Sequence, residues 1–282
     1  MLLGGIALLS AAAAAALCYG VGGFCGLGWI WILPLSFVGA FLAFALLTFL
    51  ILYILCAIVD LSKPQKHDSK FYRWVLQLIL GAVPVILQMR MHTRGLEQMP
   101  KDGRFFLVSN HINDMDPVTL LMYFNRRQLA FISKRENSSM FLVGKLMHKI
   151  MCQLINREND KEALKTIINC IHLIQEDEVS IAAFPEGYTS MDGLLHNFRH
   201  GLFKIPLRAK VPIVVCTLQN TNKIFRNAMH FKTTDVHLHL IKVLQPEDYE
   251  GMTTVQLGET VHKLMADDLG PELVLQEDKE EA

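Results

Sequence analysis

The first 59 residues contain no lysine, arginine, aspartate or glutamate, and the first charged residue of this 282-residue chain is Asp60. One apolar run extends from Leu2 to Tyr19, and a second extends from Trp29 to Val59 after a glycine-rich break. About 20 apolar residues suffice to cross the hydrocarbon core of a bilayer as a helix. Residues 1–59 are therefore predicted to form a hydrophobic membrane anchor of two transmembrane or hairpin helices.

Two other interpretations of the anchor stay open. A cleaved signal peptide competes for the first apolar run, although that run lacks a basic n-region. A hairpin that enters only one leaflet competes for the whole segment. Basic residues follow the anchor at Lys63, Lys66, Lys70 and Arg73. Because positively charged flanks stay on the cytoplasmic side of a bilayer, we expect a cell-membrane protein whose catalytic domain faces the cytoplasm.

Residues 60–93 are predicted to form a basic juxtamembrane linker and an interfacial helix. The helix is predicted over Phe71–Met91, which is strongly apolar and has Arg73 and Arg90 near its two ends. A helix with this pattern lies in a membrane interface or in a protein core. The sequence leaves both positions open.

Charge is divided unevenly along the rest of the chain. Residues 60–266 carry 26 basic and 20 acidic side chains, whereas residues 267–282 carry seven acidic and one basic. A basic body beside a membrane anchor suits an anionic lipid surface. No nucleic-acid-binding motif accompanies the charge, so the expected partner is a bilayer and not nucleic acid. Residues 267–282 are predicted to be a solvated acidic tail.

Strand-like and helix-like segments alternate over residues 94–266, which we predict to form the globular domain. The predicted strands are 104–109, 129–133, 154–155, 179–184, 212–218 and 236–244. The predicted helices are 117–124, 139–150, 161–175, 201–209 and 254–268. Such alternation is typical of an α/β domain, in which helices flank a largely parallel central sheet.

A histidine and an aspartate separated by four residues occur at four places in this domain. The four pairs are His111/Asp116, His172/Asp177, His230/Asp235 and His262/Asp267. Only His111 follows a buried type of strand and precedes a helix start, where Asp116 lies near the N-cap and Pro117 near the first helical position. An imidazole and a carboxylate placed at a strand-to-helix turn are suited to general-base chemistry, and the other three pairs are predicted to be structural.

Further polar residues follow the other predicted strands. Lys134 and Arg135 follow one strand, Arg157 follows another, and the sequence Phe-Pro-Glu-Gly-Tyr-Thr-Ser occupies residues 184–190. Arg199 precedes the helix that leads to Val211-Pro212-Ile213-Val214. Because functional groups of α/β folds gather beyond the carboxyl ends of the strands, these residues are candidates for one site.

These blocks resemble the lysophosphatidate acyltransferase family (1-acyl-sn-glycerol-3-phosphate acyltransferases, PlsC-type), which carries Asn-His-x4-Asp and Phe-Pro-Glu-Gly in this order. The resemblance covers roughly Arg94 to Leu218, and His111 and Glu186 stand 75 positions apart. It implies the α/β acyltransferase fold, with His111 as the general base that deprotonates a lipid hydroxyl and Asp116 as the group that orients the imidazole. The donor implied is an acyl-CoA or an acyl-acyl-carrier-protein thioester, and no metal or other cofactor is expected.

The resemblance also implies residues that hold a phosphorylated acceptor. They are Lys134, Arg157, Glu186 and Gly187, with Arg199 as a weaker candidate for phosphate contact. Cations and backbone amides are the groups that bind phosphate, which agrees with these residue types. Two blocks depart from the family pattern, because residues 151–157 keep only Ile155 and Arg157, and Tyr188-Thr189-Ser190 lacks the usual arginine.

The expected function is therefore that of a membrane-bound O-acyltransferase that converts lysophosphatidic acid to phosphatidic acid in phospholipid synthesis. Glycerol 3-phosphate or another lysophospholipid is the alternative acceptor. A catalytically silent lipid-binding protein of the same fold is an alternative of a different class, favoured by the two departures and opposed by the intact His111/Asp116 pair. A metal-dependent hydrolase is the weakest alternative, because His196 and His200 lack a third ligand.

Overall fold

The computed structural model describes residues 2–24, 27–190 and 192–275. The chain forms two compact units, and the division falls between Pro64 and Gln65. The last seven residues of the predicted acidic tail, 276–282, lie outside the described residues. Residues 267–269 belong to the last long helix, so this helix extends past the predicted start of the tail.

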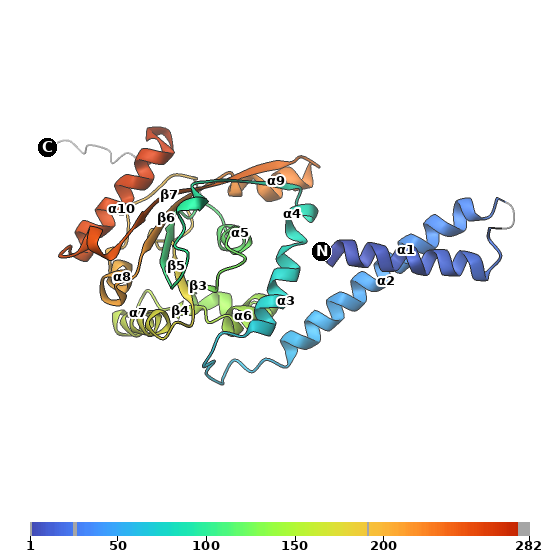
Figure 1. The fold of residues 1–282 in the computed structure, drawn as a ribbon, viewed down its shortest axis with the longest axis horizontal. Coiled ribbons are helices and arrows are strands. Elements are labelled where there is room, and N and C mark those ends of the chain that lie inside the picture. Colours follow the sequence, from blue (N-terminus) through green and yellow to red (C-terminus); the bar gives the residue numbers. More distant parts are fainter. Residues whose placement is uncertain (1, 25–26, 191, 276–282) are drawn as a thin grey trace. The chain divides into compact units, whose positions relative to one another are not determined.

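The N-terminal unit contains two apolar helices, α1 (Leu2–Gly20) and α2 (Trp29–Ala57), which pack against each other as a hairpin (Figure 1). The buried face of α1 repeats every four residues, at Ile6, Ser10, Ala14 and Cys18. Small side chains on this face let two helix backbones approach closely, as in membrane helix pairs. Both helices are long and apolar enough to cross a membrane, and most of α2 presents its apolar side chains outward.

The second unit contains one sheet, to which seven strands of the described residues contribute. The strands are β1 (Met89–Arg94), β2 (Phe106–Ser109), β3 (Leu129–Lys134), β4 (Gln153–Ile155), β5 (Ser180–Ala183), β6 (Ile213–Gln219) and β7 (Thr234–Leu244). Their order across the sheet is β1-β7-β6-β2-β5-β3-β4. β7 is antiparallel to β6, and the other neighbouring pairs are parallel. The predicted α/β class with a largely parallel sheet is therefore confirmed.

Helices cover both faces of this sheet (Figure 1). The α-helices of this unit are α3 (Lys70–Leu80), α4 (Val83–Ile86), α5 (Asp116–Tyr123), α6 (Phe141–Lys149), α7 (Asp160–Gln175), α8 (Lys204–Ala209), α9 (Ile224–Met229) and α10 (Thr254–Leu269). Short 3-10 helices are η1 (Leu96–Gln98), η2 (Arg135–Ser139), η3 (His200–Phe203), η4 (Thr221–Lys223), η5 (Pro246–Tyr249) and η6 (Pro271–Leu273).

The central strand β2 has a core on each of its two faces. Phe106 and Val108 belong to a cluster that includes buried residues of α7, α8 and α10. Phe105, just before the strand, contacts Phe124 at the end of α5 on the opposite face. All four residues of β2 are buried, and the continuous apolar run Phe105–Val108 is expected for a parallel strand covered on both sides.

The prediction of a single helix over Phe71–Met91 is wrong. α3 ends at Leu80, and a separate short helix begins around Pro84. Proline has no backbone N–H to continue a preceding helix but fits the first turn of a new one. Gln88 then takes a positive φ of 50°, and the chain continues as β1 at the edge of the sheet.

One face of α3 is part of the core. The guanidinium of Arg73 donates to both carboxylate oxygens of Asp68 and to the backbone carbonyls of Leu129 and Ile150. The other face keeps Phe71 and Trp74 about half exposed, with exposed fractions of 49% and 58%. α3 is therefore amphipathic, and its membrane-interface position stays a prediction.

Candidate active site

Asn110 extends the sheet beyond the end of β2 and so positions the histidine that follows it. Its side-chain amide donates to the carbonyl of Leu218 at 3.0 Å, and its side-chain oxygen accepts from the N–H of Leu218 at 2.7 Å. These bonds imitate one more residue pair between β2 and β6. His111 therefore leaves the carboxyl edge of the sheet from a fixed backbone.

Asp116 lies at the N-terminal end of α5 and is fully buried. Its Oδ2 accepts from Nδ1 of His111 at 2.9 Å and from the backbone N–H groups of Ile112 and Asn113 at 2.7 and 2.8 Å. Its Oδ1 accepts from the hydroxyl of Thr221. A carboxylate beside Nδ1 favours the tautomer with the proton on Nδ1, which leaves the lone pair of Nε2 free to take a proton.

The ring of His111 is fixed by stacking. It lies on the ring of Phe184 with centroids 4.1 Å apart and planes 17° apart, and Phe131 stacks behind Phe184 at 5.9 Å. The His111 side chain is 13% exposed. Its Nε2 faces the hydroxyl of Thr189 at 3.1 Å. The imidazole therefore has one orientation, with Nδ1 on the buried side and Nε2 toward the loop after β5.

Glu186 lies behind the backbone of this loop and is fully buried. Its two oxygens accept from the backbone N–H groups of His111 at 2.7 Å and His196 at 3.0 Å. Burial raises the pKa of Glu186 to about 7, against the two backbone donors, which lower it. In the structure this carboxylate connects the His111 turn to the 192–196 segment, and its expected role in acceptor binding stays a prediction.

Gly187 and two arginines form the cationic part of the site. Gly187 has φ = 83°, and a Cβ at this position would lie 2.7 Å from Cδ of Arg199, so the arginine side chain crosses directly over the glycine. Burial and the nearby charge of Arg199 lower the pKa of the Arg157 guanidinium. No ion pair within 4.0 Å involves either arginine in the described ranges 2–24, 27–190 and 192–275. The charge of Glu136 acts on Arg157 in the opposite direction and raises its pKa, so Arg157 lies within electrostatic range of both Arg199 and a carboxylate.

Lys134 is less closely associated with these groups. It is the exposed last residue of β3, paired in register with Ile155 of β4. Because β3 runs parallel to β5 and β2, Lys134 ends at the same edge of the sheet as His111. The structure therefore places Lys134 at the same edge as His111, and within the described residues it makes no hydrogen bond or ion pair with His111, Arg157 or Arg199.

Residues of the other three His-x4-Asp pairs have their partners outside the His111 site. Asp177 pairs with Arg104, Asp235 pairs with His92, and the ring of His262 packs edge-on against Phe198. His196 contacts Asp192 and Tyr188, and no group of three or more potential metal ligands was found among the described residues.

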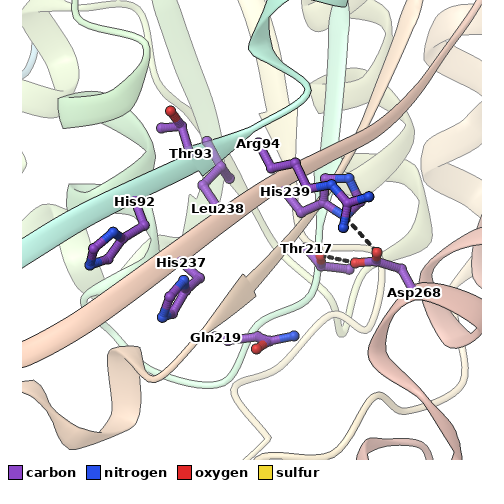
Figure 2. Close-up of a pocket in the computed structure, with 9 residues that line it drawn as sticks. All are labelled: His92, Thr93, Arg94, Thr217, Gln219, His237, Leu238, His239 and Asp268. Carbon is purple, nitrogen blue, oxygen red and sulfur yellow. Dashed lines mark hydrogen bonds and ion pairs between the residues drawn. The ribbon is translucent and has the colours of Figure 1, made fainter.

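Another His–Asp pair lies in a polar cavity of about 240 Å³ on the sheet face formed by β1, β6 and β7 (Figure 2). The lining residues are His92, Thr93, Arg94, Thr217, Gln219, His237, Leu238, His239 and Asp268. Asp268, from the end of α10, accepts from His239 and from Thr217. The rings of His92 and His237 stack with centroids 4.8 Å apart. A short sequence motif could not have predicted this contact, because His239 and Asp268 are 29 positions apart.

Sequence reasoning included Asn110 and Thr189 in the candidate blocks without giving either a role, and it missed Thr221. Asn110 directly precedes His111 in the Asn-His block, and this position could have indicated its role in placing the histidine. Thr221 lies 105 residues from Asp116 and Thr189 lies 78 residues from His111. No local pattern connects residues so far apart, because only the neighbouring positions of β2, β5 and β6 in the sheet bring them together.

The α/β sheet with the His111–Asp116 pair at its carboxyl edge agrees with the acyltransferase class predicted from the sequence, and the comparisons with known proteins support the same class. Residues 90–219 match the family model described as Acyltransferase. The 1-acyl-sn-glycerol-3-phosphate acyltransferase of Borreliella burgdorferi is 28% identical over 176 residues, which cover 60% of this chain and 70% of that protein. The human alpha form is 24% identical over 180 residues, 64% of this chain and 62% of that protein.

A solved structure adds the fold. The 1-acyl-sn-glycerophosphate acyltransferase of Thermotoga maritima matches with a TM-score of 0.56 and 19% identity, over 74% of this chain and 86% of that one. The match to the chloroplast protein of Arabidopsis thaliana covers 49% of that relative's length, so the chain spans about half of some curated relatives. Residues 90–219 therefore match the Acyltransferase family model, and the chain is similar to 1-acyl-sn-glycerol-3-phosphate acyltransferases, which are O-acyltransferases.

Proposed function

We propose that the protein transfers a fatty acyl group from an acyl-CoA or acyl-acyl-carrier-protein thioester to lysophosphatidic acid, which yields phosphatidic acid. The observation that carries the proposal is the oriented His111–Asp116 pair, with Nδ1 held at 2.9 Å by a buried carboxylate and Nε2 directed away from it. The similarity to 1-acyl-sn-glycerol-3-phosphate acyltransferases supports this substrate class.

In the proposed reaction, Nε2 of His111 takes the proton of the acceptor hydroxyl as its oxygen attacks the thioester carbonyl carbon. Asp116 stabilises the imidazolium that forms. The tetrahedral intermediate collapses, the carbon–sulfur bond breaks, and the imidazolium returns the proton to the departing thiolate. General-base catalysis of this kind contributes typically about 10²- to 10⁴-fold to the rate.

The acceptor phosphate is proposed to lie against Arg157 and Arg199. Support comes from the lowered pKa of Arg157, which reflects burial and the adjacent positive charge of Arg199. A phosphate would neutralise both guanidiniums and could accept bidentate hydrogen bonds from either. Lys134, exposed at the same edge of the sheet, and the backbone near Gly187 complete the proposed phosphate site.

A substrate comparison tests the function. Purified full-length protein receives labelled palmitoyl-CoA or palmitoyl-acyl-carrier protein, together with lysophosphatidic acid, glycerol 3-phosphate or lysophosphatidylcholine. We expect labelled phosphatidic acid as the main product. Transfer mainly to glycerol 3-phosphate or lysophosphatidylcholine would reassign the acceptor. A folded protein that transfers to none of the three would support the catalytically silent lipid-binding alternative. The departures from the family pattern at residues 151–157 and 188–190 favour this alternative.

We further propose that α1 and α2 attach the protein to the cell membrane, with the second unit on the cytoplasmic side. Deletion of residues 1–59 is expected to move most of the protein from the membrane fraction to the soluble fraction, because it removes both helices that are long enough to span a bilayer. Fractionation after a wash at high salt measures the effect. A full-length His111→Ala variant serves as the control and should stay in the membrane fraction.

The basic residues after the anchor determine what the truncated protein retains. Each lysine or arginine near an anionic surface contributes about 1 kcal/mol, and salt screens this attraction. Residual attachment through Lys63, Lys66 and Lys70 should therefore disappear in the high-salt wash. Full retention after this wash would instead assign membrane attachment to the exposed aromatic face of α3, where Phe71 and Trp74 lie.

A further inference from the structure

Exposed apolar side chains gather where the chain enters β1 and β7. In α9, Phe225 and Met229 lie one helical turn apart and are both exposed, and Phe231 follows in the loop before β7 with an exposed fraction of 86%. In α4, Val85 and Ile86 are exposed in the same way. These five residues form what we call the α4–α9 patch.

Hydrogen bonds hold the two parts of the patch together at one place in the fold (Figure 1). The backbone N–H of Thr234, the first residue of β7, donates to the carbonyl of Gln88, just after α4, at 3.0 Å. The side-chain amide of Asn227 in α9 donates to the Thr234 hydroxyl at 3.0 Å. The end of α4 and the end of α9 are therefore adjacent.

The outward position of Phe231 belongs to an ordered turn. Its φ is 53°, and its backbone N–H donates to the carbonyl of Ala228 at 3.0 Å. The backbone N–H groups of His230 and Lys232 both donate to the carbonyl of Asn227 at 2.9 Å. A positive φ is uncommon for a bulky side chain, and contiguous exposed apolar residues mark contacts with proteins, ligands or membranes. The turn therefore presents the aromatic ring to a partner.

The charge around the patch has one sign, which identifies the partner. Residues 220–234 contain Lys223, Arg226 and Lys232 and no acidic residue, and residues 69–94 contain four basic residues and no acidic one. Arg226, Lys232 and Arg90 are exposed. Apolar side chains among cations suit the surface of an anionic bilayer, where the first enter the boundary of the acyl chains and the second meet lipid phosphates.

The patch lies at the edge of the sheet that carries the candidate active site. β7 is antiparallel to β6, so its beginning lies beside the end of β6, where His237 pairs with Gln219. Thr221, two residues after β6, donates to Asp116, and α9 follows directly. A bilayer surface that binds the patch therefore meets the same edge as His111.

We propose that the α4–α9 patch docks the catalytic unit onto an anionic bilayer surface, through contacts separate from the α1–α2 hairpin. Its apolar side chains enter the boundary between headgroups and acyl chains, while Arg90, Arg226 and Lys232 bind lipid phosphates. Docking holds the catalytic edge at the depth where an acceptor anchored by its own acyl chain presents its hydroxyl. The effect on rate rests on the proposed acyl-transfer function, whereas the docking itself does not.

Hydrogen–deuterium exchange of full-length protein tests the contact. The protein is placed in nanodiscs of phosphatidylcholine, with or without phosphatidylglycerol, and in detergent. We expect peptides that cover residues 82–88 and 224–233 to exchange more slowly in the anionic nanodiscs, and the difference to shrink at high salt, because salt screens the attraction. A photoactivatable phosphatidylglycerol should label the same peptides. Peptides from the exposed face of α10, with Val255 and Lys263, are the internal reference and should exchange equally in all samples.

A double variant tests the use of the contact. Phe231→Asn removes the ring and keeps a residue that tolerates a positive φ, and Lys232→Glu reverses an exposed charge. We expect this double variant to lose the lipid labelling and to acylate lysophosphatidic acid in anionic vesicles at least about fivefold more slowly, the effect of one charge near such a surface. Its rate on short-chain lysophosphatidic acid in detergent should equal that of wild type. Val255→Ser with Lys263→Glu on α10 is the matched control and should retain labelling and both rates.

The outcomes separate this inference from the proposed function. Unchanged exchange of both peptides on anionic nanodiscs, or wild-type labelling of the double variant, overturns the docking and leaves the function standing. An equal loss of rate on vesicles and in detergent also counts against it, since that pattern indicates a disturbed catalytic edge. Protection and labelling in a protein that acylates no acceptor support the docking and refute the proposed function. Thermal melts identify a variant that does not fold, and in that case exchange and labelling of the wild-type protein decide.

Discussion

A His111→Ala variant is expected to fold normally and to lose about 10²- to 10⁴-fold in kcat/KM for acyl transfer, the range that general-base catalysis contributes. The fold should persist because the backbone of residue 111 keeps its bonds to Glu186 and Ser190, which do not use the imidazole. Asp116 also keeps three other donors, the backbone N–H groups of Ile112 and Asn113 and the hydroxyl of Thr221. What the variant lacks is the base.

Some stability is lost with the ring. His111 stacks on Phe184, and an aromatic pair of this kind contributes about 0.5–1.5 kcal/mol beyond the area it buries. A loss of this size lowers the melting temperature by a few degrees without unfolding the protein. The rate and the stability must therefore be measured on the same preparation, with steady-state kinetics in mixed micelles and a thermal melt by circular dichroism.

The His239–Asp268 pair supplies a matched control. His239 contacts Asp268 in the polar cavity, as His111 contacts Asp116, but it lies on the β7 strand and belongs to no proposed step. His239→Ala should leave kcat/KM within about twofold of wild type, since it removes a hydrogen-bonded pair outside the site. Unimpaired turnover in folded His111→Ala protein would refute the general-base assignment, and equal losses in both variants would indicate general destabilisation.

The strand-to-helix turn around His111 could be predicted because its determinants are local. The apolar run Phe105–Val108 predicts a buried strand, and Asp116-Pro117 predicts a helix start. Both elements are present as β2 and α5. Only four residues separate His111 from Asp116, and both lie in the short turn between the strand and the helix. Once these two elements were recognised, the two side chains could be expected to lie close together.

Other parts of the fold depend on contacts that the local pattern does not contain. Met89–Arg94 becomes a strand because β7, more than 140 residues later, pairs with it. The apolar composition of Phe71–Met91 fits a helix equally well. Pro84 interrupts the helix locally, but only the distant partner strand makes the last part of this segment a strand. The antiparallel direction of β7 likewise depends on the path of the chain through α9.

The acceptor side of the site was less predictable than the base. Glu186 was expected to face the acceptor, but its burial and its two backbone donors are properties of the assembled loops. The local sequence around a glutamate in a turn does not indicate whether its side chain faces solvent or the protein interior. For the same reason Thr221 was not identified and Thr189, although inside the 184–190 block, was given no role, since the partners of both residues belong to loops of other strands.

Replacement of Glu186 is expected to have the second large effect, on stability and on its pH dependence. Glu186→Ala leaves the backbone N–H groups of His111 and His196 without their acceptor, and each unsatisfied buried donor costs about 1–3 kcal/mol. The same change releases the backbone of His111. Because a displacement of about 1 Å in a catalytic group can lower a rate about 10²-fold, we expect Glu186→Ala to impair catalysis even where it remains folded.

Glu186→Gln tests the carboxylate itself through pH. The pKa of Glu186 is about 7 in the folded protein against 4.5 for an ordinary glutamate, so between these values the folded state binds more protons than the unfolded state. Stability must then fall as the pH rises through this window. A shift of this size corresponds to about 3 kcal/mol. The amide does not titrate, so the variant should lack this part of the loss.

The measurement is the free energy of unfolding of wild type and Glu186→Gln at pH 5 and pH 8, from denaturant titrations in one detergent. At pH 5 the wild-type protein should be the more stable, because a protonated carboxyl still offers acceptor oxygens to the two N–H groups, whereas the amide turns an NH₂ group toward one of them. At pH 8 this advantage should shrink or reverse by about 3 kcal/mol. Glu250→Gln, at an exposed position, is the matched control and should follow the wild-type pH dependence. If Glu186→Gln follows it too, the buried carboxylate is not the group that titrates, and its place behind His111 would be purely a matter of hydrogen bonding.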